Sequence, residues 1–168
     1  PMCGNIARQA QRQQLSLSVF DIAAEPLAEM QSLGARVASN AAELARHCAI
    51  IGICVRNDDD VEQLLYGDTG MLANAAPGTV IAIHSTVNRS SVMRWARDAE
   101  AKGVCIVDAP ITGGAAAAQA GSLCIMAGGD EQAVARCEPM FACVGQRVVY
   151  AGAVGQATVL KLANNLMN

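Results

Sequence analysis

The stretch AIIGICV, residues 49–55, is a run of seven apolar or small residues that contains no polar side chain. A strand that is apolar on both faces of its pleat is typical of the interior of a parallel sheet, where helices cover both sides. The stretch GTVIAIHST, residues 78–86, has a similar apolar centre, and a helix-like segment separates the two. Strands that alternate with helices predict an open α/β fold with a parallel sheet and right-handed crossovers.

Other segments continue this alternation. We expect further strands at residues 15–21, 104–110, 122–129 and 147–152. We expect helices at 26–34, 41–47, 57–67, 90–103, 131–145 and 155–168, with the helix at 131–145 broken near Pro139 because proline lacks an amide hydrogen. The chain opens with a helix-like segment from about Gly4. We therefore expect the sheet to lack its usual first strand and the sequence to be a fragment.

Composition indicates a folded protein with an aliphatic core. Hydrophobic residues make up 52% of the 168 residues and charged residues 16%, whereas aromatic residues are only 3%. The net charge of −3 comes without a basic cluster. This argues against a nucleic-acid partner, because binding phosphates needs lysine and arginine concentrated on one face.

The seven cysteines show no C-x-x-C spacing, so we do not expect a metal site. Those within or beside apolar runs, at positions 48, 54, 105 and 124, are interpreted as small buried hydrophobic residues in a reducing compartment. No apolar run approaches the ~18 residues of a membrane span, and no signal peptide is evident. We expect a cytoplasmic protein without a membrane partner.

The first helix and first strand suggest a dinucleotide site. Such sites pair a glycine-rich turn at a helix start with an acidic residue about 20 positions later, which binds the ribose. Here Gly4, followed by Asn5 and Ile6, stands near the helix start, and Asp21 ends the strand predicted at 15–21. The two residues after Asp21 are apolar, so no arginine is present there to bind a 2′-phosphate. This pattern favours NAD over NADP, although Asp21 is equally suited to capping the next turn.

Two further strand ends lie where ligands bind in open α/β sheets, at the carboxyl ends of the strands. The backbone around Val55 and Arg56 is expected to run alongside a bound cofactor, and Ser85 and Thr86 offer hydroxyl groups. Helix capping by Asn57 or by these hydroxyls is the alternative for each residue taken alone.

The last segment, GQATVLKLANNLMN at 155–168, is predicted to form a mostly apolar helix, which is typical of a buried one. Thr158, Lys161, Asn165 and Asn168 recur at helical spacing and form one polar stripe that must face a cleft or water. A lysine in a desolvated cleft is suited to general acid–base chemistry. A solvated lysine on a surface helix is the alternative.

The stretch DAPITGG, residues 108–114, leaves a strand and turns at the same edge. Gly113 and Gly114 expose backbone amides, and Thr112 adds a hydroxyl. Small side chains let an anion approach the main chain, so a carboxylate held there would place its hydroxyl-bearing carbon near Lys161. A flexible loop of small residues is the alternative.

Together these motifs resemble the β-hydroxyacid dehydrogenase family, which includes 3-hydroxyisobutyrate dehydrogenase and tartronate semialdehyde reductase. DAPITGGAAAAQAGSLCIMAGGD at 108–130 is similar to the family's substrate-binding signature, and GQATVLKLANNLMN resembles its interdomain helix. IAIHSTV and LLYGDTGML occur in the expected order. The resemblance covers nearly the whole chain and implies a Rossmann-like, doubly wound, mostly parallel sheet.

The resemblance also implies roles. Lys161 would be the catalytic acid–base, and Asn165 would orient the substrate or the lysine. Residues 112–114 would bind the substrate carboxylate, Asp21 would select NAD, and Thr86 would lie near the nicotinamide. Residues 1–152 would form the nucleotide-binding domain and 153–168 the start of a long interdomain helix. The resemblance also implies a helical C-terminal domain, which completes the cleft and the homo-oligomer in the family and which we expect these 168 residues to lack.

The reaction implied is NAD-dependent interconversion of a 3-hydroxy acid, such as 3-hydroxyisobutyrate, and its semialdehyde. LANN at 162–165 differs from the VHNG pattern of 6-phosphogluconate dehydrogenase, which disfavours that sugar phosphate. The presence of Lys161 argues against an imine reductase, because imine reductases of this superfamily usually lack this lysine. Tartronate semialdehyde with glycerate is an alternative substrate pair. A non-catalytic nucleotide-binding or assembly module is an alternative function, and chains exchanging elements at an unpaired strand edge are a third possibility.

Overall fold

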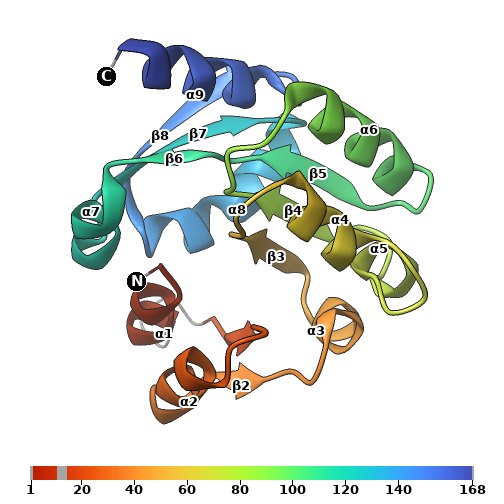
Figure 1. The fold of residues 1–168 in the computed structure, drawn as a ribbon, viewed down its shortest axis with the longest axis vertical. Coiled ribbons are helices and arrows are strands. Elements are labelled where there is room, and N and C mark those ends of the chain that lie inside the picture. The colour runs from red at the N-terminus through yellow and green to blue at the C-terminus, as the bar shows by residue number, and fades with distance from the viewer. Residues whose placement is uncertain (1, 11–14, 168) are drawn as a thin grey trace.

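The structure is a computed structural model that describes residues 2–10 and 15–167. Its helices are α1 (Met2–Ala10), α2 (Ala24–Ser32), α3 (Ala41–His47), α4 (Asp58–Leu65), α5 (Met71–Asn74), α6 (Arg89–Glu100), α7 (Gly114–Ala120), α8 (Glu131–Ala142) and α9 (Gln156–Met167). Its strands are β1 (Ser18–Val19), β2 (Arg36–Val37), β3 (Ile50–Ile53), β4 (Val80–Ile83), β5 (Cys105–Asp108), β6 (Ile111–Thr112), β7 (Leu123–Gly128) and β8 (Gly145–Gly152). The predicted α/β alternation is confirmed (Figure 1).

The main sheet has six strands in the order β3-β4-β5-β7-β6, and β8 pairs with β7. The pairs β3–β4, β4–β5 and β7–β8 are parallel, which confirms a mostly parallel sheet. Strand β7 runs antiparallel to β5 and β6. The apolar pattern did not predict this reversal, because β7 is buried along nearly its whole length, as the parallel strand β4 is.

Strands β1 and β2 form a separate parallel pair. The predicted strand at 15–21 is reduced to Ser18–Val19, and β2 was not predicted. Among residues 2–10 and 15–167, no strand bridges this pair to β3. The sheet is therefore in two parts, with β1 and β2 beside α1 and α2 (Figure 1).

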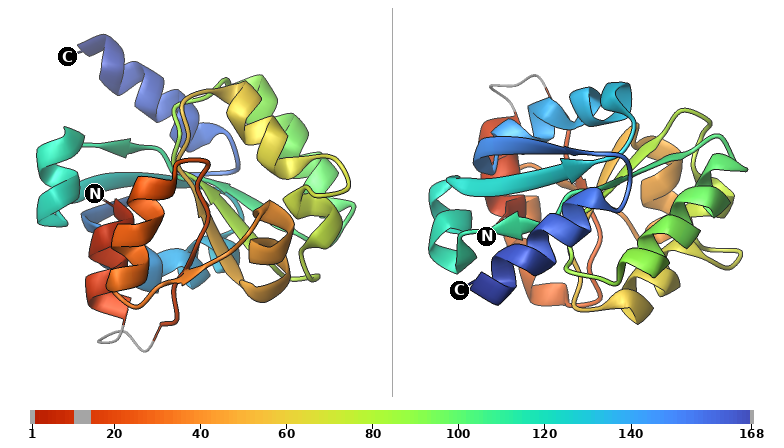
Figure 2. Two further views of the ribbon diagram at one scale, coloured as in Figure 1. Left: turned by 60° about the horizontal axis from the view of Figure 1, so that its bottom comes forward. Right: turned by 90° about the horizontal axis from the view of Figure 1, so that it is seen from above.

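The core lies on both faces of the main sheet. Strand β4 is buried at all four positions, as a strand covered on both faces requires. Side chains at 81 and 83 pack with helices α3 to α6, where Trp95, the only tryptophan, is fully buried. Side chains at 80 and 82 pack with α8 on the opposite face. Figure 2 shows these helices on either side of the strands.

Three local expectations were wrong. Helix α8 continues through Pro139, which lies in its last turn and costs one backbone hydrogen bond without ending the helix. The alanine-rich stretch after Gly113, for which no helix was predicted, is helix α7, which ends at Gly121 with φ of +69°. Cys54 and Cys105 are exposed rather than buried; all seven cysteines are free thiols.

His84 is a buried titratable group in the core. Its Nδ1 lies 2.9 Å from the Ala109 carbonyl oxygen, so this nitrogen carries the proton and donates. Its ring meets Phe141 edge-on, with centroids 5.8 Å apart. Burial lowers the pKa of His84 below 6.5, and the hydrogen bond to Ala109 opposes this only in part.

We expect His84 to make stability depend on pH. Below pH 6.5 the unfolded chain binds a proton on this ring before the folded chain does, so stability falls as the pH decreases. The contribution to this slope reaches at most about 1.4 kcal/mol per pH unit. Urea unfolding between about pH 7.5 and about pH 5 should show a flatter dependence for His84→Gln. The control is His47→Gln at the exposed histidine; equal slopes for His84→Gln and the unaltered chain would contradict the prediction.

Candidate functional site

The carboxyl ends of β3, β4 and β5 share one edge of the sheet, because these three strands are parallel and in register. The segments that follow β3 and β4 hold four of the residues predicted to contact the cofactor. Val55 and Arg56 follow β3, Ser85 and Thr86 follow β4, and Asp108 ends β5. The structure thus brings the predicted cofactor strand ends to one edge.

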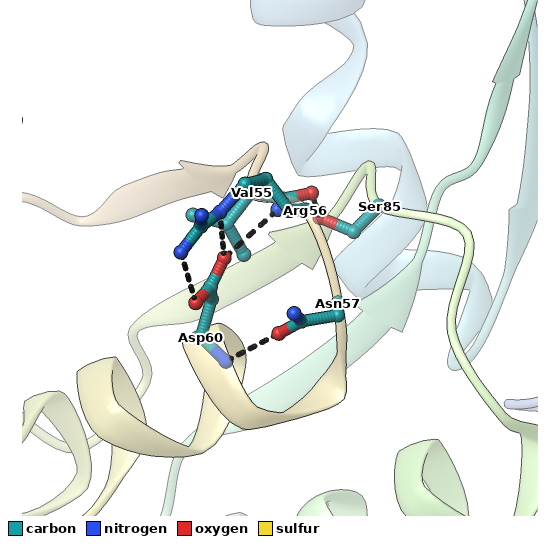
Figure 3. Close-up of polar contacts among 5 residues, drawn as sticks. All are labelled: Val55, Arg56, Asn57, Asp60 and Ser85. Carbon is teal, nitrogen blue, oxygen red and sulfur yellow. Dashed lines mark hydrogen bonds and ion pairs between the residues drawn. The ribbon is translucent and has the colours of Figure 1, made fainter.

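A reciprocal pair of hydrogen bonds joins the ends of β3 and β4 (Figure 3). The Val55 amide donates to Ser85 Oγ at 2.8 Å, and this hydroxyl donates to the Val55 carbonyl at 2.8 Å. Ser85 is buried, and its one hydroxyl proton is used. The expectation that Ser85 donates to a ligand is therefore corrected: it braces the loop, while Thr86 is exposed at the edge.

The loop after β3 is held by its own side chains. Arg56 donates to both carboxylate oxygens of Asp60, at 2.9 Å and 3.0 Å, and Asn57 caps α4 by accepting from the Asp60 amide at 2.9 Å (Figure 3). The Arg56 guanidinium holds the pKa of Asp60 below its usual range. The Arg56 amide also donates to Asp60 Oδ2, at 3.2 Å. The side chain and the amide of Arg56 are thus both engaged within the loop.

The residues predicted near the dinucleotide lie on α1 and after β1. Asn5 is buried, and its Nδ2 donates to the carbonyl oxygens of Ala118 at 2.6 Å and Gln119 at 3.2 Å, which ties α1 to α7. Gly4 is buried and Ile6 half-buried beside it. The side chain of Asn5 therefore has a structural role in this arrangement.

Asp21 is exposed immediately beyond β1. Its Oδ1 accepts from the Ala23 amide at 2.8 Å, which is the turn-capping geometry that the sequence left open. Its Oδ2 accepts no hydrogen bond from the described residues. The nearest strand arginine, Arg36 on β2, is paired with Glu43 at 2.7 Å.

Helix α9 buries a small and polar face. Ala157, Thr158 and Lys161 are its buried residues, and Lys161 is only 9% exposed. Asn165 is exposed, and Asn168 lies outside the described residues. The expectation of a helix buried by its apolar surface was wrong, because the exposed residues include Val159, Leu160, Leu162, Leu166 and Met167.

Asp108 holds the start of α9, a role that the sequence reasoning missed. It is 1% exposed; its Oδ1 accepts from the Gly155 amide at 2.7 Å, and its Oδ2 accepts from the Thr158 amide at 2.7 Å and the Thr158 hydroxyl at 2.9 Å. Helix α9 packs along β7 and β8 from this point (Figures 1 and 2). A carboxylate that ends an apolar strand was the available signal.

The turn at residues 112–114 presents bare backbone. Gly113 has φ of +125° and Gly114 has φ of +71°, and both are exposed. A Cβ on Gly113 would lie 2.7 Å from Ala117 Cβ, so glycine is required there for space as well as conformation. Thr112, half-buried, ends β6 immediately before this turn.

The described part of the chain has neither a cluster of metal-ligating side chains nor a helix that could span a membrane. Within residues 2–10 and 15–167, no group of three or more His, Cys, Asp or Glu side chains is placed to hold a metal ion. None of the helices there has the length and apolar character needed to cross a bilayer.

Comparison with known proteins gives consistent matches. A family model described as the NAD binding domain of 6-phosphogluconate dehydrogenase matches residues 1–152. An uncharacterized oxidoreductase of Mycobacterium tuberculosis is 37% identical over 151 residues, which are 90% of this chain and 51% of that protein. NAD-dependent L-serine dehydrogenase of Pseudomonas aeruginosa is 33% identical over 149 residues, which are 89% of this chain and 50% of that protein.

Among solved structures, 3-hydroxyisobutyrate dehydrogenase of Salmonella typhimurium superposes with a TM-score of 0.89 at 28% identity. The match covers 99% of this chain and 59% of that one. The chain spans about half the length of the curated relatives it matches. Helix α9 lies beyond the residues that the family model matches.

Proposed function

The chain belongs to the β-hydroxyacid dehydrogenase family, as its NAD-binding domain, and from that membership we propose that the whole protein is an NAD-dependent 3-hydroxyacid dehydrogenase. The observation that carries this proposal is the burial of Lys161 on α9, beyond the carboxyl end of β5. Residues 1–152 are proposed to form the nucleotide-binding domain and 153–168 to begin an interdomain helix.

Lys161 is proposed to move the proton. Bound NAD would supply the hydride acceptor for the carbon that carries the hydroxyl. Neutral Lys161 takes the hydroxyl proton at Nζ as the C–O single bond becomes a carbonyl, so the products are the semialdehyde, NADH and a lysine ammonium. In the reverse direction the ammonium of Lys161 returns the proton. Asn165 is proposed to orient the substrate or the lysine.

The substrate carboxylate is proposed to bind at Thr112, Gly113 and Gly114. Two observations support this placement: the glycine backbone is exposed, and no atom lies within 4 Å of a Cβ built on Gly114. An anion can therefore reach the amides there without displacing a side chain. Holding the carboxylate fixes the distance from the hydroxyl carbon to the acid–base, and such positioning lowers the barrier of the reaction.

The dinucleotide is proposed to lie over α1 and the strand ends, with contacts from Gly4, Asn5, Ile6, Val55, Arg56, Ser85 and Thr86. For Asn5 and Ser85 the backbone is the proposed contact, because their side chains are engaged elsewhere. The guanidinium and the amide of Arg56 both donate to Asp60, so its contact would require that pairing to change. Asp21 is proposed to bind the ribose hydroxyls through its free Oδ2. Its negative charge, with Arg36 engaged by Glu43, favours NAD over NADP.

A second function from another class has its own support. The exposed apolar side of α9 suits assembly, either as a non-catalytic nucleotide-binding module or as part of a homo-oligomer. The free thiols are consistent with the cytoplasmic location that we propose. For the substrate, 3-hydroxyisobutyrate is the leading proposal, with L-serine and glycerate as alternative 3-hydroxy acids.

Turnover of a substrate panel tests the proposal. We expect the whole protein to reduce NAD with a 3-hydroxy acid and to use NADP more slowly. Asp21→Ala should raise KM for NAD about tenfold, because the ribose hydroxyls lose the carboxylate that accepts their hydrogen bonds. It should also reduce the preference for NAD over NADP, because the carboxylate no longer repels the 2′-phosphate of NADP. The measurement is kcat/KM for both cofactors.

The matched control for Asp21→Ala is Asp59→Ala, at an exposed aspartate of α4. It should leave both cofactor constants unchanged. Nucleotide binding by calorimetry without turnover of any 3-hydroxy acid would favour the binding module, and an unchanged NAD preference in Asp21→Ala would remove the role of Asp21.

A further inference from the structure

The link between Asp108 and α9 differs from an ordinary helix cap. Asp130 shows the ordinary kind: it is exposed, directly precedes α8, and accepts one bond, from the Ala133 amide at 3.0 Å. Asp108 is buried and comes from β5, and its partners Gly155 and Thr158 lie 47 and 50 residues further along the chain. Such a cap fixes where the helix starts relative to the sheet, in addition to satisfying its amides.

Gly128 of β7, which has no side chain, leaves room for the Asp108 carboxylate. A Cβ on Gly128 of β7 would lie 2.7 Å from Asp108 Oδ1, 3.0 Å from the Ala153 carbonyl oxygen and 3.1 Å from the Ala157 nitrogen. The lack of a side chain on β7 thus lets the helix start and the carboxylate meet. A buried charge with three donors at the positive end of a helix is well compensated.

Lys161 lies one turn of α9 beyond this link. Thr158 and Lys161 are three residues apart and point to the same buried side of the helix. Beyond Lys161, residues 162, 163 and 165–167 are exposed and Asn164 is half-buried. Asp108 therefore holds the buried side of α9 within one turn of the lysine.

We propose that Asp108 is a positioning residue that holds Lys161 at the carboxyl edge of the sheet through its bonds to Gly155 and Thr158. That this position of Lys161 serves catalysis rests on the proposed function. That Asp108 holds Lys161 in this position does not. Asp108 moves no proton; it sets the distance between Lys161 Nζ and a substrate held at the 112–114 turn.

The test uses a property of this sequence: Lys102 and Lys161 are its only lysines. Lys102 is exposed and Lys161 is buried. Limited acylation with an amine-reactive reagent, read by peptide mass spectrometry, gives the ratio of label on Lys161 to label on Lys102 in the folded chain. Asp108→Asn and Thr158→Val should each raise this ratio about tenfold, because charge-assisted hydrogen bonds at the helix start are lost.

Two comparisons make the result specific. Asp130→Asn alters a helix-capping aspartate in the same way and should leave the ratio unchanged. Thr158→Ser keeps the hydroxyl and should restore the low ratio. In the whole protein, Asp108→Asn should lower kcat by on the order of tenfold, with little change in KM for NAD.

Three outcomes decide the matter. A raised ratio with rescue by Thr158→Ser supports the inference. A folded Asp108→Asn or Thr158→Val chain with an unchanged ratio overturns it. If the ratio rises but Lys161→Ala keeps full turnover, the positioning of the helix stands and the proposed acid–base function fails, so the two failures are distinguished.

Discussion

Replacing Lys161 by alanine should lower kcat by about 100- to 10,000-fold while leaving NAD affinity unchanged. The amine is the group proposed to take the hydroxyl proton, and alanine can neither accept nor return one. The truncation removes a side chain that is 9% exposed, so folding must be checked by thermal unfolding alongside the kinetics. Steady-state turnover of the whole protein with its best 3-hydroxy acid, and calorimetry with NAD, are the measurements.

The matched control is Lys102→Ala, which removes the other lysine of the chain from an exposed position after α6. It should keep full activity. If kcat is retained in Lys161→Ala, the assignment of this lysine as the acid–base is refuted. Added small primary amines are expected to restore part of the rate, since they supply the missing acceptor in the space left by the side chain.

Replacing Gly128 by alanine should destabilise the fold by about 3 kcal/mol. The added methyl group would press on the Asp108 carboxylate, which three hydrogen bonds hold in place, and on backbone atoms of residues 153 and 157. The free energy of unfolding from urea titration measures this effect. Because the crowding falls on the anchor of α9, label on Lys161 should also increase.

Gly52→Ala is the control for the added methyl group. Gly52 is also a strand glycine, on β3, and neither glycine has a positive φ. A Cβ there would lie 3.3 Å from two side-chain atoms, His84 Nε2 and Met140 Sδ. Because methionine adjusts readily, the cost should stay under about 1 kcal/mol. Equal costs at both positions would show that crowding at Asp108 is not the cause.

Much of the fold was predictable because buried strands and helices leave apolar patterns in the sequence. The apolar runs at 49–55 and 78–86 are β3 and β4, and helix α3 matches its predicted range of 41–47. Of these two strands, burial on both faces is confirmed for β4 only, because β3 ends the strand order of the main sheet and its Gly52 is exposed. The reversal of β7 was not foreseen, because this strand is apolar and nearly as buried as the parallel strand β4. Helix α7 was missed because a segment of alanines has no polar face to mark its period.

The candidate site was predictable as a set of residues but not in its orientation. The stripe through Thr158 and Lys161 was recognised, yet the pattern alone favoured an inward apolar side for α9. What decides otherwise is a tertiary bond, from Asp108 to the helix start. Likewise the Ser85 hydroxyl was expected to face a ligand, whereas its partner is a backbone on the neighbouring strand end. Long-range hydrogen bonds of this kind leave no periodic signal.

The separation of β1 and β2 from the main sheet has a consequence for how cofactor choice would work. A ladder of two short strands has little cooperativity of its own, so local opening there needs less free energy than opening β4. Asp21, proposed to read the ribose, extends from this weaker ladder. A ligand that binds only the ordered form stabilises it by mass action. Ribose binding and the ordering of the β1–β2 pair then form one coupled equilibrium. The fraction of protein with nucleotide bound determines the fraction in which the Asp21 carboxylate is positioned to distinguish NAD from NADP.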